Sequence, residues 1–178
     1  GDALLLAARE LPRKVPLSVG QPHEGQHLPR AITLAGARHA PWPQLEAVLE
    51  HVDLLHFDVK HMDPVRHEEL TGQSNGLILD NLRKISSIKP PLDVIIRVPV
   101  IPGYTDSVEN IGATAEFVAG LGLMKIELVP YHRMGTSKYA QYGMAYPLEG
   151  CQPPSEADMT HLREIAEGIG LTEVSGTI

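Results

Sequence analysis

Short apolar runs alternate with amphipathic stretches along this chain. Three runs have the length and the β-branched content of buried strands: residues 54–60 (LLHFDVK), 93–100 (DVIIRVPV) and 125–131 (KIELVPY). Before the first run, apolar residues fall at helical spacing, namely Leu45, Val48, Leu49 and Val52. Helix therefore leads directly into strand, which is typical of an α/β fold.

The segments between and after the runs predict further helices. One helix is expected between the second and third runs, where Ile111, Ala115 and Val118 form an apolar stripe. Asp106 and Glu109 have capping-box spacing before this stripe, and Gly120 and Gly122 mark its end. Shorter helices are expected near 64–70 and 80–87, on either side of TGQSNG, and a last one from about Ser155, its N-cap, to Gly168. Repeated βα units predict a parallel sheet with right-handed crossovers.

The amino-terminal part is harder to interpret. Residues 2–10 indicate the end of an amphipathic helix, whereas 11–43 are rich in Pro, Gly and His and show little periodicity. No low-complexity segment interrupts the chain, so we expect residues 1–178 to form a single domain.

The first strand has one polar face. Side chains alternate along a strand, so Leu54, His56, Asp58 and Lys60 share one side, while the residues between them share the other. Burying ions is costly unless they are paired or used in chemistry, so Asp58 and Lys60 mark a candidate site.

Two further polar residues stand at strand ends. Arg97 lies in the second strand, and His132 follows the third. Taken singly, Arg97 could belong to a structural ion pair and His132 could be a turn histidine. Ligands of parallel α/β sheets bind at the carboxyl ends of the strands, so together these residues predict a shared polar pocket. Such a pocket would suit a ligand with a carboxylate, ribose hydroxyls and an amine.

Composition narrows the function classes. The 178 residues carry a net charge of −7 without a basic run, which argues against nucleic-acid binding. No apolar run reaches the roughly 18 residues of a membrane span, so we expect a soluble, cytoplasmic chain, and its start at Gly1 suggests that its beginning is missing. Cys151 is the only cysteine, and the histidines at 51, 56, 61 and 67 fit no common metal signature. We expect no metal ligand here.

Three strings connect these features to a known family. FDVKHMDPVRHEELTG, IIRVPVIPGYTDSVENI and IELVPYHRMGTSKYAQYGMAYPL, in this order, closely resemble the radical S-adenosylmethionine enzymes that activate glycyl radical enzymes, such as the pyruvate formate-lyase activating enzyme. The resemblance is good over residues 42–178 and poor over residues 1–41.

The resemblance implies a fold, a cofactor and partners. The fold would be a partial (β/α) barrel of the radical-SAM type that lacks its N-terminal units, with S-adenosylmethionine across the carboxyl ends of the strands. The positions that match the family's cofactor contacts are Asp58, Val59, Lys60, Arg97 and His132. Family members also hold a 4Fe-4S cluster, receive electrons from a donor such as flavodoxin or ferredoxin, and form a glycyl radical on a partner enzyme.

The chain departs from the family at the cluster. The CxxxCxxC motif and the GGEP-like segment that grips the ligand's amino group are absent. TLAGARHAPW resembles the family's threonine-x-glycine strand end, which makes Thr33 and Gly36 further candidates. We expect the carboxyl-terminal portion of an activating enzyme, without a catalytic residue of its own and inactive alone. The alternatives are a non-catalytic binding module that keeps part of the nucleotide pocket or the partner-docking surface, and an α/β domain whose matching strings serve packing alone.

Overall fold

The computed structural model describes residues 31–34, 40–89, 91–133, 146, 148–171 and 173–175. They form five strands and five helices, in the order β1 (Ala31–Leu34), α2 (Trp42–Leu49), β2 (Leu54–Asp58), α3 (Pro64–Thr71), α4 (Gly76–Ser86), β3 (Asp93–Val100), α5 (Val108–Gly120), β4 (Lys125–Pro130), α7 (Glu156–Gly168) and β5 (Glu173–Ser175). The helix expected over 2–10 lies outside the described residues.

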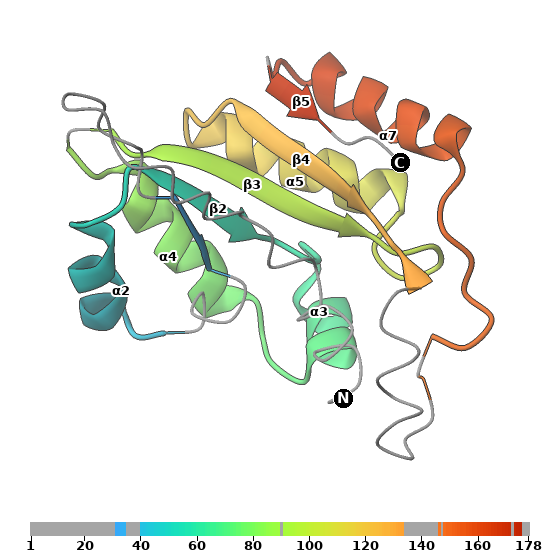
Figure 1. Ribbon diagram of the computed structural model, residues 1–178, viewed down its shortest axis with the longest axis horizontal. Helices are drawn as coiled ribbons and strands as arrows, with labels where there is room; N and C mark the ends of the chain where they lie inside the picture. Colours follow the sequence, from blue (N-terminus) through green and yellow to red (C-terminus); the bar gives the residue numbers. More distant parts are fainter. Residues whose placement is uncertain are drawn as a thin grey trace, which may run out of the picture.

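The strands form one parallel sheet in the order β1-β2-β3-β4-β5 (Figure 1). Each strand therefore pairs with its neighbour in the chain. The predicted α/β class is confirmed, and so is the prediction that the three apolar runs lie parallel and adjacent. The sheet is open, with β1 and β5 at its edges, as in a partial barrel.

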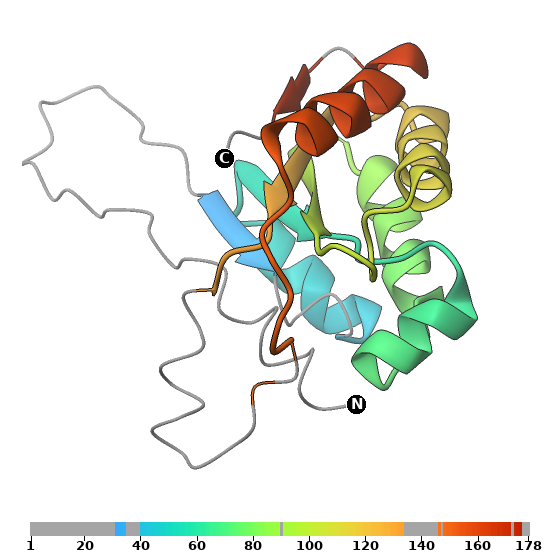
Figure 2. The same ribbon diagram turned by 90° about the vertical axis from the view of Figure 1, so that its right-hand side faces the viewer.

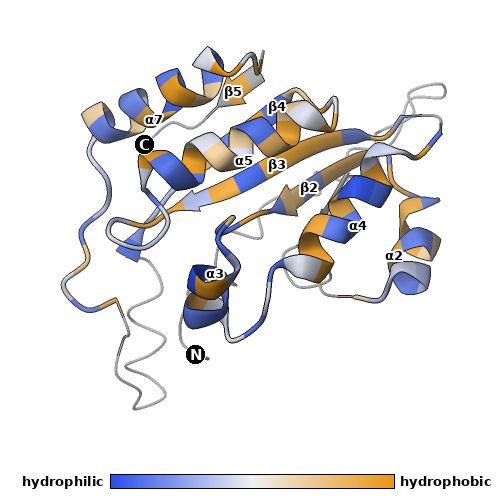
Figure 3. Cartoon of the chain, turned by 180° about the vertical axis from the view of Figure 1, so that it is seen from behind, coloured by the Kyte–Doolittle hydropathy of each residue, from blue (hydrophilic) through white to orange (hydrophobic). Residues whose placement is uncertain are grey.

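The helices cover one face of this sheet. Figure 2 shows α4 and α5 on the same side of the strands, and the described residues place no helix on the other side. The covered face of β2 carries Leu55, Phe57 and Val59, all buried. Figure 3, seen from the helix side, shows β2 and β3 as mostly hydrophobic.

The core lies between this face and the helices. The strands contribute alternate β-branched and aliphatic residues, and each helix contributes an apolar stripe. The buried helical residues include Leu45 and Leu49 of α2, Ile78, Leu82 and Ile85 of α4, Ile111, Ala115 and Val118 of α5, and Met159 and Leu162 of α7. Helical spacing thus predicted the stripe of α5, whereas Val48 of the α2 pattern faces solvent with 41% exposed.

Several predicted boundaries need correction. The N-cap of α5 is Ser107, whose hydroxyl accepts from the Asn110 amide at 3.1 Å. The predicted capping box of Asp106 and Glu109 is wrong, because the Asp106 carboxylate instead accepts from the Gly103 amide at 2.8 Å in the preceding turn. Helix α4 begins at Gly76, four residues before the expected start, with Asn75 at the N-cap position.

Other boundaries agree with the sequence. Ser155 caps α7 in a full capping box with Asp158. Gly122, at φ +72°, follows the end of α5 in the left-handed conformation that glycine adopts without strain. The short strand β5 was not predicted, and β1 was expected only through the resemblance of TLAG to the family's strand end.

Candidate functional site

The predicted site residues lie in or just after the central strands: Asp58 ends β2, and Arg97 lies three residues before the end of β3. In the register of the sheet, Asp58 of β2 pairs with Arg97 of β3, and Arg97 in turn pairs with Glu127 of β4. These three positions form a row across the face that the helices leave open. Lys60 follows β2 by two residues and His132 follows β4 by two, so both lie at the same carboxyl edge of the sheet.

Asp58 and Arg97 form a buried ion pair. The Nε and Nη2 atoms of Arg97 donate to Oδ1 of Asp58 at 2.8 and 2.7 Å. The side chains are only 1% exposed for Asp58 and 12% for Arg97. Two donors on one oxygen fix the direction of both groups, since the guanidinium is planar and rigid. The structural ion pair considered for Arg97 is therefore present.

Val59 and Lys60 continue beyond β2 in an extended path. The Val59 amide donates to the Arg97 carbonyl at 2.9 Å, which prolongs the pairing with β3. The Val59 side chain packs in the hydrophobic core, so only its backbone faces the strand-end edge. Lys60 is buried, at 4% exposed. A buried lysine is costly unless it is paired or used in chemistry.

His132 is exposed at the end of β4. The residue before it is fixed: the Tyr131 amide donates to the Val100 carbonyl at 3.0 Å, and its hydroxyl is 2.7 Å from that of Tyr146. His132 is thus placed at the correct edge without a described contact to Asp58, Lys60 or Arg97. Residues 134–145 of the matching string lie outside the described residues.

Two residues of the open face were not predicted as site residues. His56 Nδ1 is buried, has no hydrogen-bond partner within the described residues, and lies 3.8 Å from Oε2 of Glu127. Glu127 stands in the same row as the ion pair. The period-two pattern of KIELVPY was the signal that could have found Glu127, because it places Glu127 on the polar face.

Of the further candidates, Thr33 lies in β1, where its backbone pairs with His56. Gly36 lies outside the described residues. Thr33 therefore lies beside His56, two residues before the level of the ion pair. The residues that follow β1 lie outside the described part of the chain.

The histidines of the following loop have structural partners. Buried His67 lies with Nδ1 2.7 Å from the Gln73 carbonyl, and the Thr71 hydroxyl is 3.1 Å away. His61 Nδ1 accepts from the Asp63 amide at 3.0 Å, and burial lowers the pKa of His61, against the opposing effect of Asp63. Within the described ranges, no three His, Cys, Asp or Glu side chains gather as a metal site.

Cys151 is a half-buried loop residue beside the small apolar cluster of Ile101, Tyr131 and Leu148. Burial raises the pKa of its thiol, and the Asp106 carboxylate adds to this rise. A thiol that stays protonated is a poor metal ligand.

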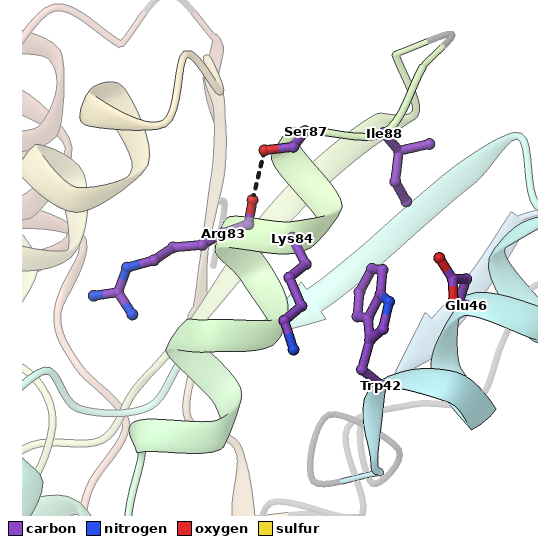
Figure 4. A pocket seen from close by; sticks show the side chains of 6 residues that line it. All are labelled: Trp42, Glu46, Arg83, Lys84, Ser87 and Ile88. Carbon is purple, nitrogen blue, oxygen red and sulfur yellow. Dashed lines mark hydrogen bonds between the residues drawn. The ribbon is translucent and has the colours of Figure 1, made fainter.

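A separate pocket of about 600 Å³ lies between α2 and α4 (Figure 4). Its walls include Trp42 and Lys84, whose Nζ stands 5.4 Å from the indole centroid. The pocket is formed by the last turn of α4, which leads into the start of β3. It therefore lies at the amino ends of the strands, away from the candidate site.

None of the helices in the described residues is both long and apolar enough to cross a membrane.

Comparisons with known proteins agree with this geometry. The chain is 42% identical over 140 residues to the indoleacetate decarboxylase activating enzyme of Tractidigestivibacter scatoligenes. The aligned residues cover 79% of this chain and 44% of that protein. It is 43% identical over 114 residues to the isethionate sulfite-lyase activating enzyme of Oleidesulfovibrio alaskensis, covering 64% and 36% respectively. The chain thus spans less than half the length of these curated relatives. No family model matches it.

Solved structures support the fold. A domain of the pyruvate-formate lyase-activating enzyme from Bacteroides vulgatus superposes with a TM-score of 0.66 at 27% identity, over 85% of this chain and 82% of that domain. A radical SAM methyltransferase from Sphaerobacter thermophilus gives a TM-score of 0.62 at 15% identity, over 83% and 39%. The second likeness concerns the fold alone.

Proposed function

We propose that this chain, a homologue of the glycyl radical enzyme activating enzymes over the part of their length that it spans, supplies the S-adenosylmethionine contacts of such an enzyme. The observation that carries the proposal is the ion pair of Asp58 and Arg97 on adjacent parallel strands, with the buried Lys60 two residues beyond Asp58. Packing alone does not require a buried lysine, a buried carboxylate and a partly buried arginine in this part of the sheet.

The residues suit this ligand in different ways. The Lys60 ammonium and the His132 imidazole would donate to the ligand's carboxylate or ribose hydroxyls. The Asp58 carboxylate, oriented by Arg97, would accept from a hydroxyl or from the ligand's amino group. Val59 would contribute its backbone. Charge-assisted hydrogen bonds of this kind contribute about 1.5–3 kcal/mol each.

The residues of this chain do not fit an iron–sulfur cluster. Such a cluster needs several thiolates, and Cys151 is the only cysteine, with a raised pKa and in a loop. Reconstitution of this chain with iron and sulfide without air should therefore give no stoichiometric cluster and no visible absorption band. A stable cluster would contradict this assignment.

In the whole protein we propose the family's activity, formation of a glycyl radical on a partner enzyme with electrons from a donor such as flavodoxin or ferredoxin. The cofactors carry that chemistry, and the protein binds and orients them. The DNA upstream of the codon for Gly1 tests this step. A CxxxCxxC sequence in any frame supports the activating enzyme, and its absence favours a binding module.

The binding module remains the second candidate, because one half-buried thiol is all that this chain offers to a cluster. It would keep the strand-end contacts and lack radical chemistry. Both candidates need the cofactor contacts, so the upstream sequence separates them and a binding experiment does not.

Ligand binding tests the strand-end contacts directly. S-adenosylmethionine added to this chain should bind weakly and shift the nuclear magnetic resonance signals of Asp58, Val59 and Arg97, which both lysine variants retain. Lys60→Met should abolish the response, whereas Lys89→Met, at an exposed lysine of the loop after α4, should preserve it. Equal binding by the wild type and Lys60→Met would overturn the assignment. Micromolar affinity that is lost in His132→Ala would show instead that the pocket is complete in this chain.

A further inference from the structure

Two buried asparagines converge on the three residues that follow β2. Asn110 lies in the first turn of α5, Asn75 is the N-cap residue of α4, and they are 3% and 4% exposed. Both contact the segment 60–62, which begins with Lys60. Since a buried amide is costly without partners, the hydrogen bonds of these two residues explain their positions.

Asn110 holds the segment by both ends of its amide group. Its Oδ1 accepts from the Met62 amide at 2.9 Å, and its Nδ2 donates to the Lys60 carbonyl at 3.2 Å. Asn75 supports the same path, because its Nδ2 donates to the carbonyls of His61 and Met62 at 3.1 and 2.8 Å. The backbone that carries Lys60 is thus fixed by side chains from two different helices.

Asn110 also joins this segment to the turn after β3. Its Nδ2 donates to the Thr105 carbonyl at 2.8 Å. The Thr105 hydroxyl in turn accepts from the Ile101 amide at 2.9 Å and donates to the Pro99 carbonyl, which fixes the turn to the end of β3. One side chain therefore connects the loops that follow β2 and β3, the two strands that carry Asp58 and Arg97.

We infer that Asn110 is a positioning residue of the candidate cofactor site, which holds Lys60 in register with the ion pair of Asp58 and Arg97. The inference rests on the proposed function, because Lys60 is a cofactor contact only under that proposal. An amide is required here, since the group must accept from one amide and donate to two carbonyls. A carboxylate at this position could still accept from the Met62 amide, but it has no proton to donate to the carbonyls of Lys60 and Thr105.

This requirement gives a pH-dependent test. Asn110→Ala removes all three bonds, whereas Asn110→Asp restores a donor once its carboxyl is protonated, and burial among carbonyls raises the pKa of such a group. The matched control is Asn81→Asp. Asn81 is equally buried in α4, but its Nδ2 donates to the Ala40 carbonyl at 3.1 Å, before α2 and away from the site.

The first readout is the response of Lys60 to S-adenosylmethionine in the full chain. At pH 7.5 both Asn110 variants should weaken the apparent affinity by about tenfold, which corresponds to about 1.4 kcal/mol. Near pH 5 the Asp variant should recover while the Ala variant does not, and Asn81→Asp should stay within about twofold of the wild type throughout. Equal losses in Asn110→Asp and Asn81→Asp, without recovery at low pH, would overturn the inference.

The second readout needs no ligand. The Met62 amide should exchange with solvent about tenfold faster in Asn110→Ala, relative to core amides of β3, and unchanged exchange would also overturn the inference. A third outcome is faster exchange of the Met62 amide in Asn110→Ala while Lys60 of the wild type shows no response to S-adenosylmethionine. That result would refute the proposed function and leave Asn110 as a residue that fixes the segment 60–62.

Discussion

The two faces of the sheet are built from the same strands and differ completely in chemistry. On the helix-covered face, Leu55, Phe57 and Val59 alternate with the residues of the open face, which are His56, Asp58 and Lys60. The first set is apolar and buried in the core, while the second includes the Asp58 carboxylate, which pairs with Arg97 of β3. The covered face thus supplies the apolar core, and the open face carries the candidate site, where a buried ion pair also contributes to stability.

The largest effect is expected on the covered face. Phe57→Ala removes a fully buried ring from the centre of the core. The lost burial and the remaining cavity should lower the free energy of unfolding by about 3–5 kcal/mol. Chemical denaturation measures this change. A loss below about 1 kcal/mol would show that the core on this face is loosely packed.

The next effect concerns the ion pair of the open face. Arg97→Met leaves the Asp58 carboxylate buried without its strongest partner and should cost about 3 kcal/mol in the free energy of unfolding. Adding Asp58→Leu should recover most of that stability, because an apolar pair of similar volume needs no desolvated charge. Denaturation of both variants tests this. Failure of the double variant to recover would mean that the polar pair itself stabilises the fold.

A smaller effect is expected at the capping box of α7, which packs beside α5. The Ser155 hydroxyl accepts from the Asp158 amide at 3.2 Å, so Ser155→Ala should cost about 1 kcal/mol in thermal or chemical denaturation. Ala157→Ser, at an exposed position in the same first turn, is the control and should change stability by less than about 0.5 kcal/mol.

The same capping box sets a pH dependence. The Ser155 hydroxyl donates to the Asp158 carboxylate at 2.6 Å, which lowers the pKa of Asp158. A lowered folded pKa contributes stability above the ordinary aspartate pKa of about 4, and this is lost as the pH falls through the folded value. In Asp158→Asn the unfolding midpoint should therefore depend less on pH below about 4. The same pH dependence in Asp158→Asn and in the wild type would contradict a lowered pKa of Asp158 as its cause.

The smallest effect is expected for the ion pair of Lys125 and Asp93, at the amino ends of β4 and β3. The Nζ and Oδ1 atoms are 2.9 Å apart, but both side chains are well exposed to solvent. Lys125→Met should change the free energy of unfolding by less than about 1 kcal/mol, and the difference should shrink further in high salt. A loss of unfolding free energy as large as that expected for Arg97→Met would show that the exposed pair of Lys125 and Asp93 stabilises the fold as much as the buried pair of Arg97 and Asp58.

The central strands could be predicted because they are continuous apolar runs between amphipathic helices. The edge strands β1 and β5 have four and three residues, too few for a period to stand out. The polar face of β2 could also be predicted, because side chains alternate between the two faces of a strand. Asn110 was not, because its role depends on contacts with Lys60, 50 residues earlier, which only the folded chain brings together.

The sequential strand order has a consequence for how the chain folds. Each strand pairs with the next one along the chain, and Asp58 and Arg97 meet across a separation of 39 residues. The entropy cost of closing a loop grows only with the logarithm of its length, so the units face comparable barriers. Pairing can then spread from any inner pair of strands toward both edges, one βα unit at a time. Loss of a unit at an edge would leave the inner nucleus of β2, β3 and β4 able to form.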